Sequence, residues 1–418
     1  MNILLSAYAC RPNSGSEEGN GWFSSVSLAQ MNHQVWVLTC FASRPSIEQE
    51  IQKREIPNLR FIYVNTPNNL GQRIMNRTRL SWQYSYFNWQ YEALKVAKQL
   101  DKKINFDIVH HVTWGSITAG SRLWLLPKPF VFGPVGGGQT APTALKKYFL
   151  NHWKNEALRS FIFSRLASWN WFFRQTVNHA DLVLATNQDT YEMAVGAGAK
   201  QVKLFFDPGL PEDYFPDKMP TRPINNELKL LWVGSILPRK GLRLTLEALS
   251  QVDPSIPVKL TIVGSGSQSQ DLPEWIQEFG LEKRVNCCGR LPWLEVKELY
   301  RKSDVFFFTS LRDSCPTQFL EAMSYGLPII TLNIHGAIKL IPDEAGVKVK
   351  VTDAEQTVSK LANAVQYLYE HPQQRLTMGQ VGYEFAKTQT WTSKANKLTV
   401  YYEELIKASK QKRLVSTK

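Results

Sequence analysis

The feature that most constrains the fold is a repeated alternation of short apolar runs with longer amphipathic stretches. The runs are rich in β-branched and aromatic residues, and helical patterns such as residues 242–250 and 295–302 separate them. This alternation predicts βαβ units, in which helices join parallel strands. The predicted strands are residues 2–7, 34–39, 61–64, 107–112, 129–135 and 181–186 in the first half, and 228–234, 258–264, 304–309 and 328–332 in the second.

One polar, proline-rich passage at residues 211–227 interrupts the alternation and has the composition of an interdomain linker. A chain of 418 residues also exceeds the size at which one hydrophobic core keeps growing, so we expect two domains. We place them at residues 1–214 and 215–391, and expect a C-terminal helix at about 392–418 to cross back onto the first. Both are predicted to be α/β, Rossmann-like domains with doubly wound parallel sheets, facing a central cleft.

The net charge of +13 favours anionic partners, namely phosphate-bearing substrates, an anionic membrane surface or nucleic acid. A basic surface without a specific partner is the alternative. Nucleic acid is the weakest candidate, because the basic residues are spread along the chain and no helix-turn-helix, RNA-recognition or zinc motif occurs in the sequence.

The cysteines and the N-terminal sequence bear on the compartment. Five cysteines are scattered along the chain, and two of them, Cys287 and Cys288, are adjacent, which does not suit a disulfide framework. The chain starts with a strand-like run that lacks the layout of a signal peptide, and no apolar run reaches about 18 residues. We therefore expect a cytoplasmic protein without a transmembrane helix.

A loop at residues 233–241 follows the first strand of the second domain. Gly234 and Gly241 allow tight backbone geometry there, and Arg239 and Lys240 place two cations at the start of a helix. Cations and free N–H groups in this position neutralise a diphosphate leaving group as its charge develops. For this motif alone, a solvated basic turn is the simpler interpretation, since such motifs are loose.

A second loop leads into a short helix near residue 316. Ser314 is expected to cap the helix N-terminus, Pro316 to occupy the first turn and Gly326 to end the helix. The backbone amides around Cys315 to Gln318 would then offer a binding site for an anion or a hydroxyl group.

Glu321 interrupts the apolar face of this same helix and belongs to a polar stripe at helical spacing. A solvated stripe is the ordinary explanation. The strands at 304–309 and 328–332, however, have the composition of fully buried strands, so we expect the stripe to line the cleft, where carboxylates bind sugar hydroxyls. The stripe consists of Ser314, Thr317, Glu321 and Ser324.

Taken together, these segments resemble the nucleotide-sugar half of glycosyltransferase family 4, the retaining "group 1" transferases of GT-B fold. The matching segments are VGSILPRKG (233–241), VGSGS (263–267), CCGRLP (287–292) and RDSCPTQFLEAMSYGLPI (312–329). They cover nearly all of the second domain in the order of the family, which makes the combination more specific than any single segment.

The resemblance implies that Glu321 holds the nucleotide ribose, that Asp313 meets hydroxyls of the transferred sugar and that Lys240 binds the diphosphate. Two positions depart from the family pattern. Asp313 stands where the family usually has Glu, and Ser235 stands where it usually has an arginine, whose phosphate contact Arg239 would take over. The other implied donor-binding residues are Gly19, Gly234, Arg239, Cys315, Pro316 and Thr317.

The first domain resembles the same superfamily less strongly. Residues 7–22 place Gly19 in a glycine-rich loop, which in the family lies near the donor phosphates and the acceptor; a flexible loop is the alternative. Gly136 and Gly137 follow a later strand and are acceptor-side candidates, with a plain turn as the alternative.

Two further pairs in this domain are candidates. His110 and His111 end a strand, and related transferases often place a histidine against the donor sugar. Strand alternation directs the two to opposite faces, so only one can enter the cleft. We choose His111 as a catalytic candidate, with a packed histidine as the alternative. Glu17 and Glu18 are candidates for acceptor binding or for a base, with exposed loop acids as the simpler interpretation.

The implied chemistry is transfer with retention, in which the donor's own phosphate takes the acceptor proton. The catalytic candidates Lys240, Asp313 and His111 do not form the carboxylate pair of a nucleophile and an acid. No DxD triplet occurs in the sequence, so we expect no essential metal and no cofactor beyond the nucleotide-sugar co-substrate.

Residues 145–174 contain six Lys or Arg, one acid, Glu156, and nine aromatic residues. This mixture suits a segment that lies at an anionic membrane surface, and residues 77–91 are similar. Packing of the aromatic residues into the first domain, or their stacking on acceptor sugars, are the alternatives. The basic tail at residues 407–418 is expected to be frayed and solvated.

The sequence thus predicts a retaining, metal-independent glycosyltransferase of the hexosyltransferase type. It would move a sugar from a nucleotide-sugar to a glycan or lipid-linked acceptor in polysaccharide or glycoconjugate assembly, in the cytoplasm or peripherally on the inner face of the membrane. One alternative is a GT-B sugar-nucleotide epimerase or hydrolase. The other is a non-catalytic, membrane-associated scaffold subunit, for which Ser235 and Asp313 would be early signs.

Overall fold

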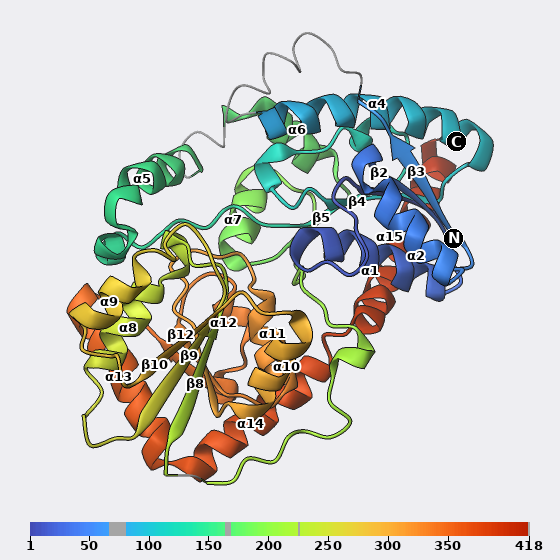
Figure 1. Cartoon of the computed structure of the whole chain (residues 1–418). Helices are drawn as coiled ribbons and strands as arrows, with labels where there is room; N and C mark the ends of the chain where they lie inside the picture. The colour runs from blue at the N-terminus through green and yellow to red at the C-terminus, as the bar shows by residue number, and fades with distance from the viewer. Residues whose placement is uncertain (67–80, 164–168, 225, 417–418) are drawn as a thin grey trace. The chain divides into compact units, whose positions relative to one another are not determined.

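The computed structural model describes residues 1–66, 81–163, 169–224 and 226–416. These residues form two compact units, each built on a parallel β-sheet flanked by helices (Figure 1). Unit 1 consists of Met1–Gly138, Leu166–Gly209 and Trp391–Lys418, and unit 2 of Gln139–Arg165 and Leu210–Thr390. Each unit therefore contains segments that are distant in the sequence.

The sheet of unit 1 has seven strands: β1 (Asn2–Ala7), β2 (Gln34–Cys40), β3 (Leu59–Val64), β4 (Ile108–Thr113), β5 (Phe130–Val135), β6 (Leu182–Ala185) and β7 (Val202–Leu204). All pair in parallel, in the order β3-β2-β1-β4-β5-β6-β7. Leu4 of β1 lies in one buried cluster, and Ile3 and Leu5 lie in another. Because neighbouring side chains point to opposite faces, both faces of the sheet are covered.

The sheet of unit 2 has six strands: β8 (Leu228–Val233), β9 (Val258–Val263), β10 (Val285–Gly289), β11 (Val305–Phe307), β12 (Ile329–Leu332) and β13 (Gly346–Val349). They are also parallel, in the order β10-β9-β8-β11-β12-β13. Leu230 and Leu231 of β8 are both fully buried, which places this strand in the core of the unit.

The α-helices of unit 1 include a C-terminal one that packs against the first. Ring stacking between Phe23 and Trp391, with centroids 5.6 Å apart, contributes to that contact. The helices are α1 (Ser16–Gln30), α2 (Arg44–Lys53), α4 (Ser81–Ile104), α6 (Trp171–His179), α7 (Gln188–Gly196) and α15 (Trp391–Ser416).

The helices of unit 2 connect its strands, apart from one that precedes them in the sequence and two that follow the last strand. The α-helices are α5 (Trp153–Phe161), α8 (Leu242–Ser250), α9 (Leu272–Glu278), α10 (Trp293–Lys302), α11 (Thr317–Ser324), α12 (Ala337–Leu340), α13 (Ala354–Glu370) and α14 (Pro372–Lys387). Two 3₁₀ segments, η4 (Thr143–His152) and η8 (Pro238–Lys240), also belong to this unit.

In each sheet the strand order reverses beside the first strand of the unit. The reversal falls between β1 and β4 in unit 1 and between β8 and β11 in unit 2. Loops that diverge at such a switch point leave a crevice beyond the carboxyl ends of the strands, where doubly wound folds bind their ligands. The loops after these four strands are therefore the first places to look for a site.

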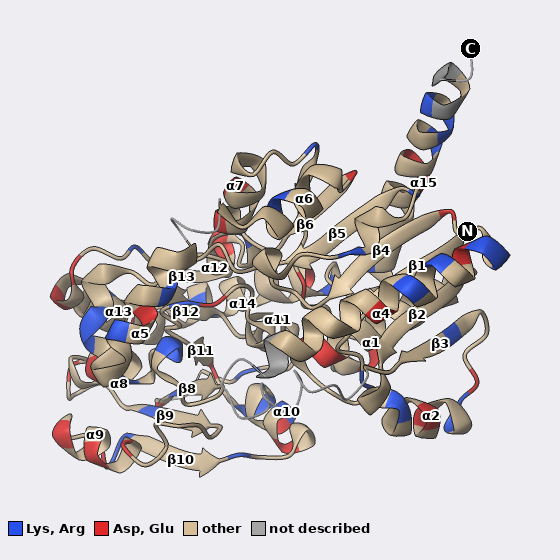
Figure 2. Cartoon of the chain, turned by 90° about the horizontal axis from the view of Figure 1, so that it is seen from above, with Lys and Arg blue, Asp and Glu red and all other residues tan. Residues whose placement is uncertain are grey.

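The predicted α/β class with two doubly wound sheets is confirmed, and all ten predicted strands are present. Three short strands, β7, β10 and β13, were missed. The prediction of a frayed tail is wrong, because α15 continues to Ser416, and Figure 2 shows basic positions along its C-terminal part. Residues 139–165, which the predicted boundary at 214 assigns to the first domain, belong to unit 2.

Candidate functional site

The loops after β8 and β11 meet at a cluster of charged side chains. Lys240 Nζ donates a hydrogen bond to Oδ2 of Asp313, and Nη1 of Arg239 lies 3.5 Å from the same oxygen. The backbone also joins the loops, since the N–H of Leu311 donates to the carbonyl oxygen of Arg239 at 2.8 Å. Three residues predicted for one site thus come together from two distant segments.

Burial and charge act against each other in this cluster. Burial opposes ionisation of Asp313, but Lys240 and Arg239 outweigh it and lower the pKa of the carboxyl. Burial lowers the pKa of Lys240, which is only 7% exposed; Asp313 counteracts this, whereas Arg239 and Arg312 add to it. The cations around Asp313 therefore favour its carboxylate form, while they repel one another.

A glycine makes the close approach of these loops possible. Gly241 has a φ of +67°, and a Cβ there would lie 2.2 Å from the carbonyl oxygen of Thr309. The hydroxyl of Thr309 in turn donates to the carbonyl oxygen of Gly241 at 2.8 Å. Any other residue would force the loop with Lys240 away from the loop with Asp313.

Glu321 lies on α11 and is held by a buried tyrosine. The hydroxyl of Tyr300, on α10, donates to Oε2 of Glu321 at 2.9 Å. Burial raises the pKa of Glu321, and the Tyr300 hydrogen bond and Lys297 partly offset that rise. The carboxylate is thus oriented through one oxygen. Sequence reasoning missed Tyr300, although it stands on a helix that the sequence predicted.

The start of α11 differs from the prediction. Pro316 occupies the N-cap position and the helix begins at Thr317, so Ser314 is not the N-cap. The main-chain N–H of Ser314 instead donates to Oδ1 of Asp313 at 3.1 Å. The end of the helix is as predicted, with Gly326 in the left-handed region at a φ of +69°.

The polar stripe on α11 is shorter than predicted. Ser324 is fully buried and its hydroxyl donates to the carbonyl oxygen of Glu321, so it lines no surface. Ser314 and Thr317 are half-buried, as is Glu321. Cys315 is buried and is not part of a disulfide. Ser235, which stands where the family usually has an arginine, is exposed.

Gly234 and Gly19 contribute through close packing. A Cβ at Gly234 would lie 3.1 Å from the ring of Phe308, and one at Gly19 would lie 2.2 Å from the carbonyl oxygen of Ser14. Gly19 therefore shapes the start of α1 in unit 1, whereas Gly234 lies directly after β8 in unit 2.

In unit 1, Glu17 reaches the ends of two neighbouring strands. Its Oε1 accepts a hydrogen bond from the N–H of Gly115, whose carbonyl oxygen accepts from the N–H of Gly136 at 2.7 Å. Burial raises the pKa of Glu17, and the Gly115 hydrogen bond lowers it in part. Glu18 instead points toward solvent, where it pairs with Arg11 at 3.4 Å.

An aromatic cluster, consisting of Tyr8, Tyr86, Trp89 and Trp114, surrounds the end of β1. The ring centroid of Tyr8 lies 5.2 Å from that of Tyr86, 5.1 Å from that of Trp89 and 5.9 Å from that of Trp114. Burial raises the pKa of Tyr86, and the charge of Glu17 raises it further. Gly137, the remaining acceptor-side candidate, has a φ of +117°.

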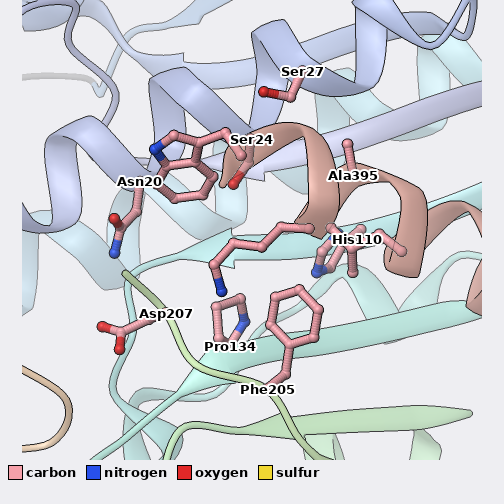
Figure 3. A pocket seen from close by; sticks show the side chains of 11 residues that line it. Asn20, Ser24, Ser27, His110, Pro134, Phe205, Asp207 and Ala395 are labelled. Atoms are coloured by element: carbon pink, nitrogen blue, oxygen red, sulfur yellow. The ribbon is translucent and has the colours of Figure 1, made fainter. Parts of the chain in front are cut away.

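Both candidate histidines are buried on opposite faces of β4. His110 Nδ1 lies 2.5 Å from the hydroxyl of Tyr402, and burial lowers the pKa of His110 to about 3. Figure 3 shows it beside Pro134 at a cavity of about 10 Å³, which holds about one water molecule and no sugar. His111 Nε2 lies 3.0 Å from the carbonyl oxygen of Trp114, and burial lowers its pKa to about 4.

The two aromatic segments, residues 77–91 and 145–174, contain both buried and exposed aromatic side chains. Tyr86, Trp89 and Phe149 are buried, as packing predicts. In contrast, Trp169 and Trp171 are 84% and 67% exposed. Parts of both segments, at residues 77–80 and 164–168, lie outside the described residues.

Unit 2 has an apolar cavity of about 510 Å³ that sequence reasoning missed. It lies at the carboxyl ends of β8, β9 and β10, where Ile236, Gly264 and Gly289 contribute to its walls. A space of this size accommodates a planar ring system such as a nucleobase.

Two features of the described residues bear on membrane insertion and on metal binding. Within residues 1–66, 81–163, 169–224 and 226–416, no helix has both the length and the apolarity needed to cross a bilayer. The same part of the chain contains no group of three or more His, Cys, Asp or Glu side chains placed to hold a metal ion.

Comparisons with known proteins identify two matching families. Residues 216–385 match the family described as "Glycosyl transferases group 1", and residues 25–204 match "Glycosyltransferase Family 4". Together these regions cover most of the chain.

Among curated relatives, the GPI3 subunit of the phosphatidylinositol N-acetylglucosaminyltransferase of Saccharomyces cerevisiae is 26% identical over 162 residues, or 37% of this chain and 36% of the relative. The chain spans between about a third and a half of the length of the first curated relatives it matches.

Two solved structures share the fold. Sucrose-phosphate synthase from Thermosynechococcus elongatus matches with a TM-score of 0.67 and 19% identity, over 97% of this chain and 99% of that one. HepE from Anabaena, solved in complex with UDP, matches with a TM-score of 0.65 and 18% identity, over 97% and 100%.

Proposed function

The chain belongs to the group 1 glycosyltransferases of GT-B fold, and from that premise we propose that it transfers a sugar from a nucleotide-sugar donor to a glycan or lipid-linked acceptor. The observation that carries the proposal is the donor-side arrangement of unit 2. There, Lys240 and Arg239 pair with Asp313 at the switch point. On the adjoining helix α11, Glu321 accepts a hydrogen bond from Tyr300.

Each of these groups suits one part of a nucleotide-sugar. Lys240 and Arg239 provide positive charge for the diphosphate, Asp313 accepts hydrogen bonds from hydroxyls of the transferred sugar, and Glu321 accepts those of the ribose. Tyr300 donates to only one oxygen of Glu321, Oε2. The other oxygen lies outside this hydrogen bond, which suits a carboxylate that binds a diol. The apolar cavity beyond β8, β9 and β10 is a candidate place for the base.

We propose that transfer proceeds with retention and without an essential metal. The cations of unit 2 take the part that a metal plays elsewhere, because they stabilise the departing diphosphate as the sugar becomes positively charged. Asp313 is engaged by Lys240 and Arg239, and Glu321 by Tyr300, so neither is placed as a free nucleophile. The donor's own phosphate would then accept the proton of the acceptor hydroxyl. A catalytic role for His111 remains a prediction.

For the acceptor, we propose the surface of unit 1 around Glu17. The half-buried carboxylate of Glu17, beside the half-buried side chains of Tyr8 and Trp114, provides a hydrogen-bond acceptor next to aromatic faces, a combination that suits a sugar. Gly115 and Gly136 lie beside this carboxylate, joined by a hydrogen bond from the N–H of Gly136 to the carbonyl oxygen of Gly115.

We also propose a peripheral contact with anionic membranes from the cytoplasmic side. The exposed tryptophans 169 and 171 are of the kind that insert at the headgroup level, and the net charge of +13 favours an anionic surface. Co-sedimentation with phosphatidylglycerol vesicles, but not with phosphatidylcholine vesicles, is expected. Equal binding to both, or none to either, would refute the contact.

The donor site is tested by calorimetric titration with UDP, GDP and ADP in the presence of EDTA. We expect one nucleotide to bind with micromolar affinity, and Glu321→Ala to weaken it about 10-fold or more, since hydrogen bonds to a charged group contribute about 1.5–3 kcal/mol. Glu370→Ala, at an exposed position of α13 in the same unit, serves as the matched control. A folded protein that binds none of the three would contradict the proposal and favour a non-catalytic scaffold.

A further inference from the structure

The segment of residues 139–163, here termed the inserted segment, lies in the sequence between two elements of unit 1 but belongs to unit 2. It contains η4 and α5, and η4 packs on η8, the turn that carries Arg239 and Lys240. Lys147 pairs with Glu247 of α8 at 2.7 Å, and the side chains of Tyr148 and Phe149 are buried. The segment is therefore a fixed part of the donor-side unit.

Helix α5 of this segment has an inverted polarity. Glu156 is only 8% exposed, whereas Leu158 is 60% exposed and Phe161 is 55% exposed. A helix that simply packs on a core buries its apolar face and leaves its charges in water. The inverted arrangement indicates that the charged face of α5 meets a specific partner in unit 2.

That partner is Arg312, the residue directly before Asp313. Oε1 of Glu156 lies 2.6 Å from Nε of Arg312, and Nη1 of Arg159 lies 3.8 Å from the same oxygen. Arg159 also donates to the carbonyl oxygen of Gln139 at 3.2 Å, which fixes it against the inserted segment. Glu156 and Arg312 thus form a close ion pair, although Nε of Arg312 is not aligned for a hydrogen bond to Oε1 of Glu156.

The resulting cluster carries more positive than negative charge. Its cations are Arg159, Arg239, Lys240 and Arg312, and its carboxylates are Glu156 and Asp313. The pKa of Arg159 is lowered to about 10, chiefly by burial and then by Arg312 and Arg239, and Glu156 offsets this only in part. Excess buried charge of one sign is unfavourable unless an ion of opposite sign balances it. A group with two negative charges would do so.

We propose that Arg312 and Arg159 bind the diphosphate of the donor together with Arg239 and Lys240, and that Glu156 is a positioning residue that holds Arg312 through their ion pair. This inference rests on the proposed function, because it assumes a nucleotide-sugar in unit 2. It also accounts for Ser235: the phosphate contact that an arginine usually makes at that position would come from the cations of the neighbouring loop and of α5 instead.

The test compares a nucleoside diphosphate with the matching nucleoside, which lacks phosphate. Both probes carry the nucleobase that the unmodified chain binds. The affinity of the nucleoside, which binds more weakly, is measured by competition calorimetry. We expect Arg312→Gln and Arg159→Gln each to weaken diphosphate binding about 10-fold or more, as the loss of a charged hydrogen bond predicts, and to leave nucleoside affinity within about twofold. Arg312→Lys keeps the charge but not the forked geometry, so it is expected to recover only part of the affinity.

Glu156→Gln tests the positioning role, since it keeps the size of the side chain but removes the charge that holds Arg312. Diphosphate binding should weaken about threefold to 10-fold, again without a change for the nucleoside. Glu247→Gln is the matched control, because it breaks an ion pair of the same segment outside the cluster and should leave both affinities unchanged. If an arginine variant lowers Tm strongly, Glu156→Gln decides the outcome.

The outcomes separate this inference from the proposed function. If the unmodified chain binds a nucleoside diphosphate and Glu321→Ala loses it, but the cluster variants bind normally, the inference is wrong and the function stands. Equal weakening of diphosphate and nucleoside would show a structural role only and would also overturn the inference. If the unmodified chain binds no nucleotide, the proposed function fails and the inference fails with it.

Discussion

The switch-point loops of the two units have the same position in the fold but carry different chemistry. In unit 2, the loops after β8 and β11 bring together Lys240, Arg239 and Asp313, and α5 adds further charges. In unit 1, the loops after β1 and β4 bring together aromatic rings and the half-buried carboxyl of Glu17. The same sheet plan thus supports a charged site in one unit and an aromatic site in the other.

This difference follows from what each kind of ligand requires. A diphosphate is recognised by charge, and buried cations attract it strongly because little water screens them. A sugar is neutral, so aromatic faces and a few oriented hydrogen-bond groups suffice. If the assignment is correct, substitutions in unit 2 alter donor binding and have little effect on the acceptor. Substitutions in unit 1 alter acceptor use and have little effect on the donor.

The largest effect is expected for Lys240→Ala. It removes a buried cation and leaves Asp313 with Arg239 as its remaining ion-pair partner among the described residues. We expect nucleotide affinity to fall about 100-fold by calorimetry, since truncating one member of a buried charge pair costs about 2–5 kcal/mol. Lys350→Ala, at an exposed position of the same unit, is the control. Normal nucleotide binding by Lys240→Ala would show that the charged cluster of unit 2 does not bind the nucleotide.

Glu17→Gln is expected to have the next largest effect, and only on the acceptor side. Gln keeps an oxygen that accepts from Gly115 but loses the negative charge, so kcat/KM for the acceptor should fall about 10-fold. The Kd for the nucleotide should not change. Glu18→Gln, whose side chain is directed to solvent beside Arg11, should behave like the unmodified chain. A matching loss of nucleotide affinity in Glu17→Gln would show that the two sites are not separate.

A smaller effect is expected for Tyr300→Phe, which removes one hydrogen bond to Glu321. Nucleotide affinity should fall about fivefold at neutral pH, in keeping with a net contribution of about 1 kcal/mol. The hydroxyl also lowers the pKa of Glu321, so the variant should lose nucleotide binding at a higher pH on acidification than the unmodified chain does. An unchanged pH profile would show that Tyr300 does not act through Glu321. Tyr367→Phe on α13 is the control.

These residues also show what the sequence could and could not predict. Lys240, Asp313 and Glu321 follow or adjoin strongly apolar strands, so strand periodicity alone brings them to one edge of a sheet. The pair of Glu156 and Arg312 joins segments more than 150 positions apart, and no local pattern predicts a helix whose charged face is buried.

The errors have local causes. Ser314 has the residue type of an N-cap, but Pro316 lies next to the first helical residue and has an extended ψ of 122°, so it takes the cap position instead. Strand alternation correctly directed His110 and His111 to opposite faces, but it could not show that helices cover both faces. The strands β7, β10 and β13 are short and lie at or near sheet edges, where apolar runs are weakest.

The last prediction concerns acid stability, which should differ between the units. Burial lowers the pKa of His110 to about 3 and that of His111 to about 4, so unit 1 favours the neutral imidazoles. This stabilisation is complete above the unfolded pKa of about 6.5 and is lost as the pH falls toward the folded values. Asp313 in unit 2 has a lowered pKa as well, but its contribution is lost only below about pH 4, the usual range of an aspartate.

Between pH 7 and pH 5, unit 1 should therefore lose more protection than unit 2. Hydrogen exchange followed by mass spectrometry, corrected for the intrinsic dependence of exchange on pH, measures each unit separately. His111→Gln, which cannot be protonated, should reduce the loss in unit 1, whereas His371→Gln at an exposed position of unit 2 should not alter it. Equal loss in both units would mean that the buried histidines do not set the acid sensitivity of unit 1, and that the units differ only at their ligand sites.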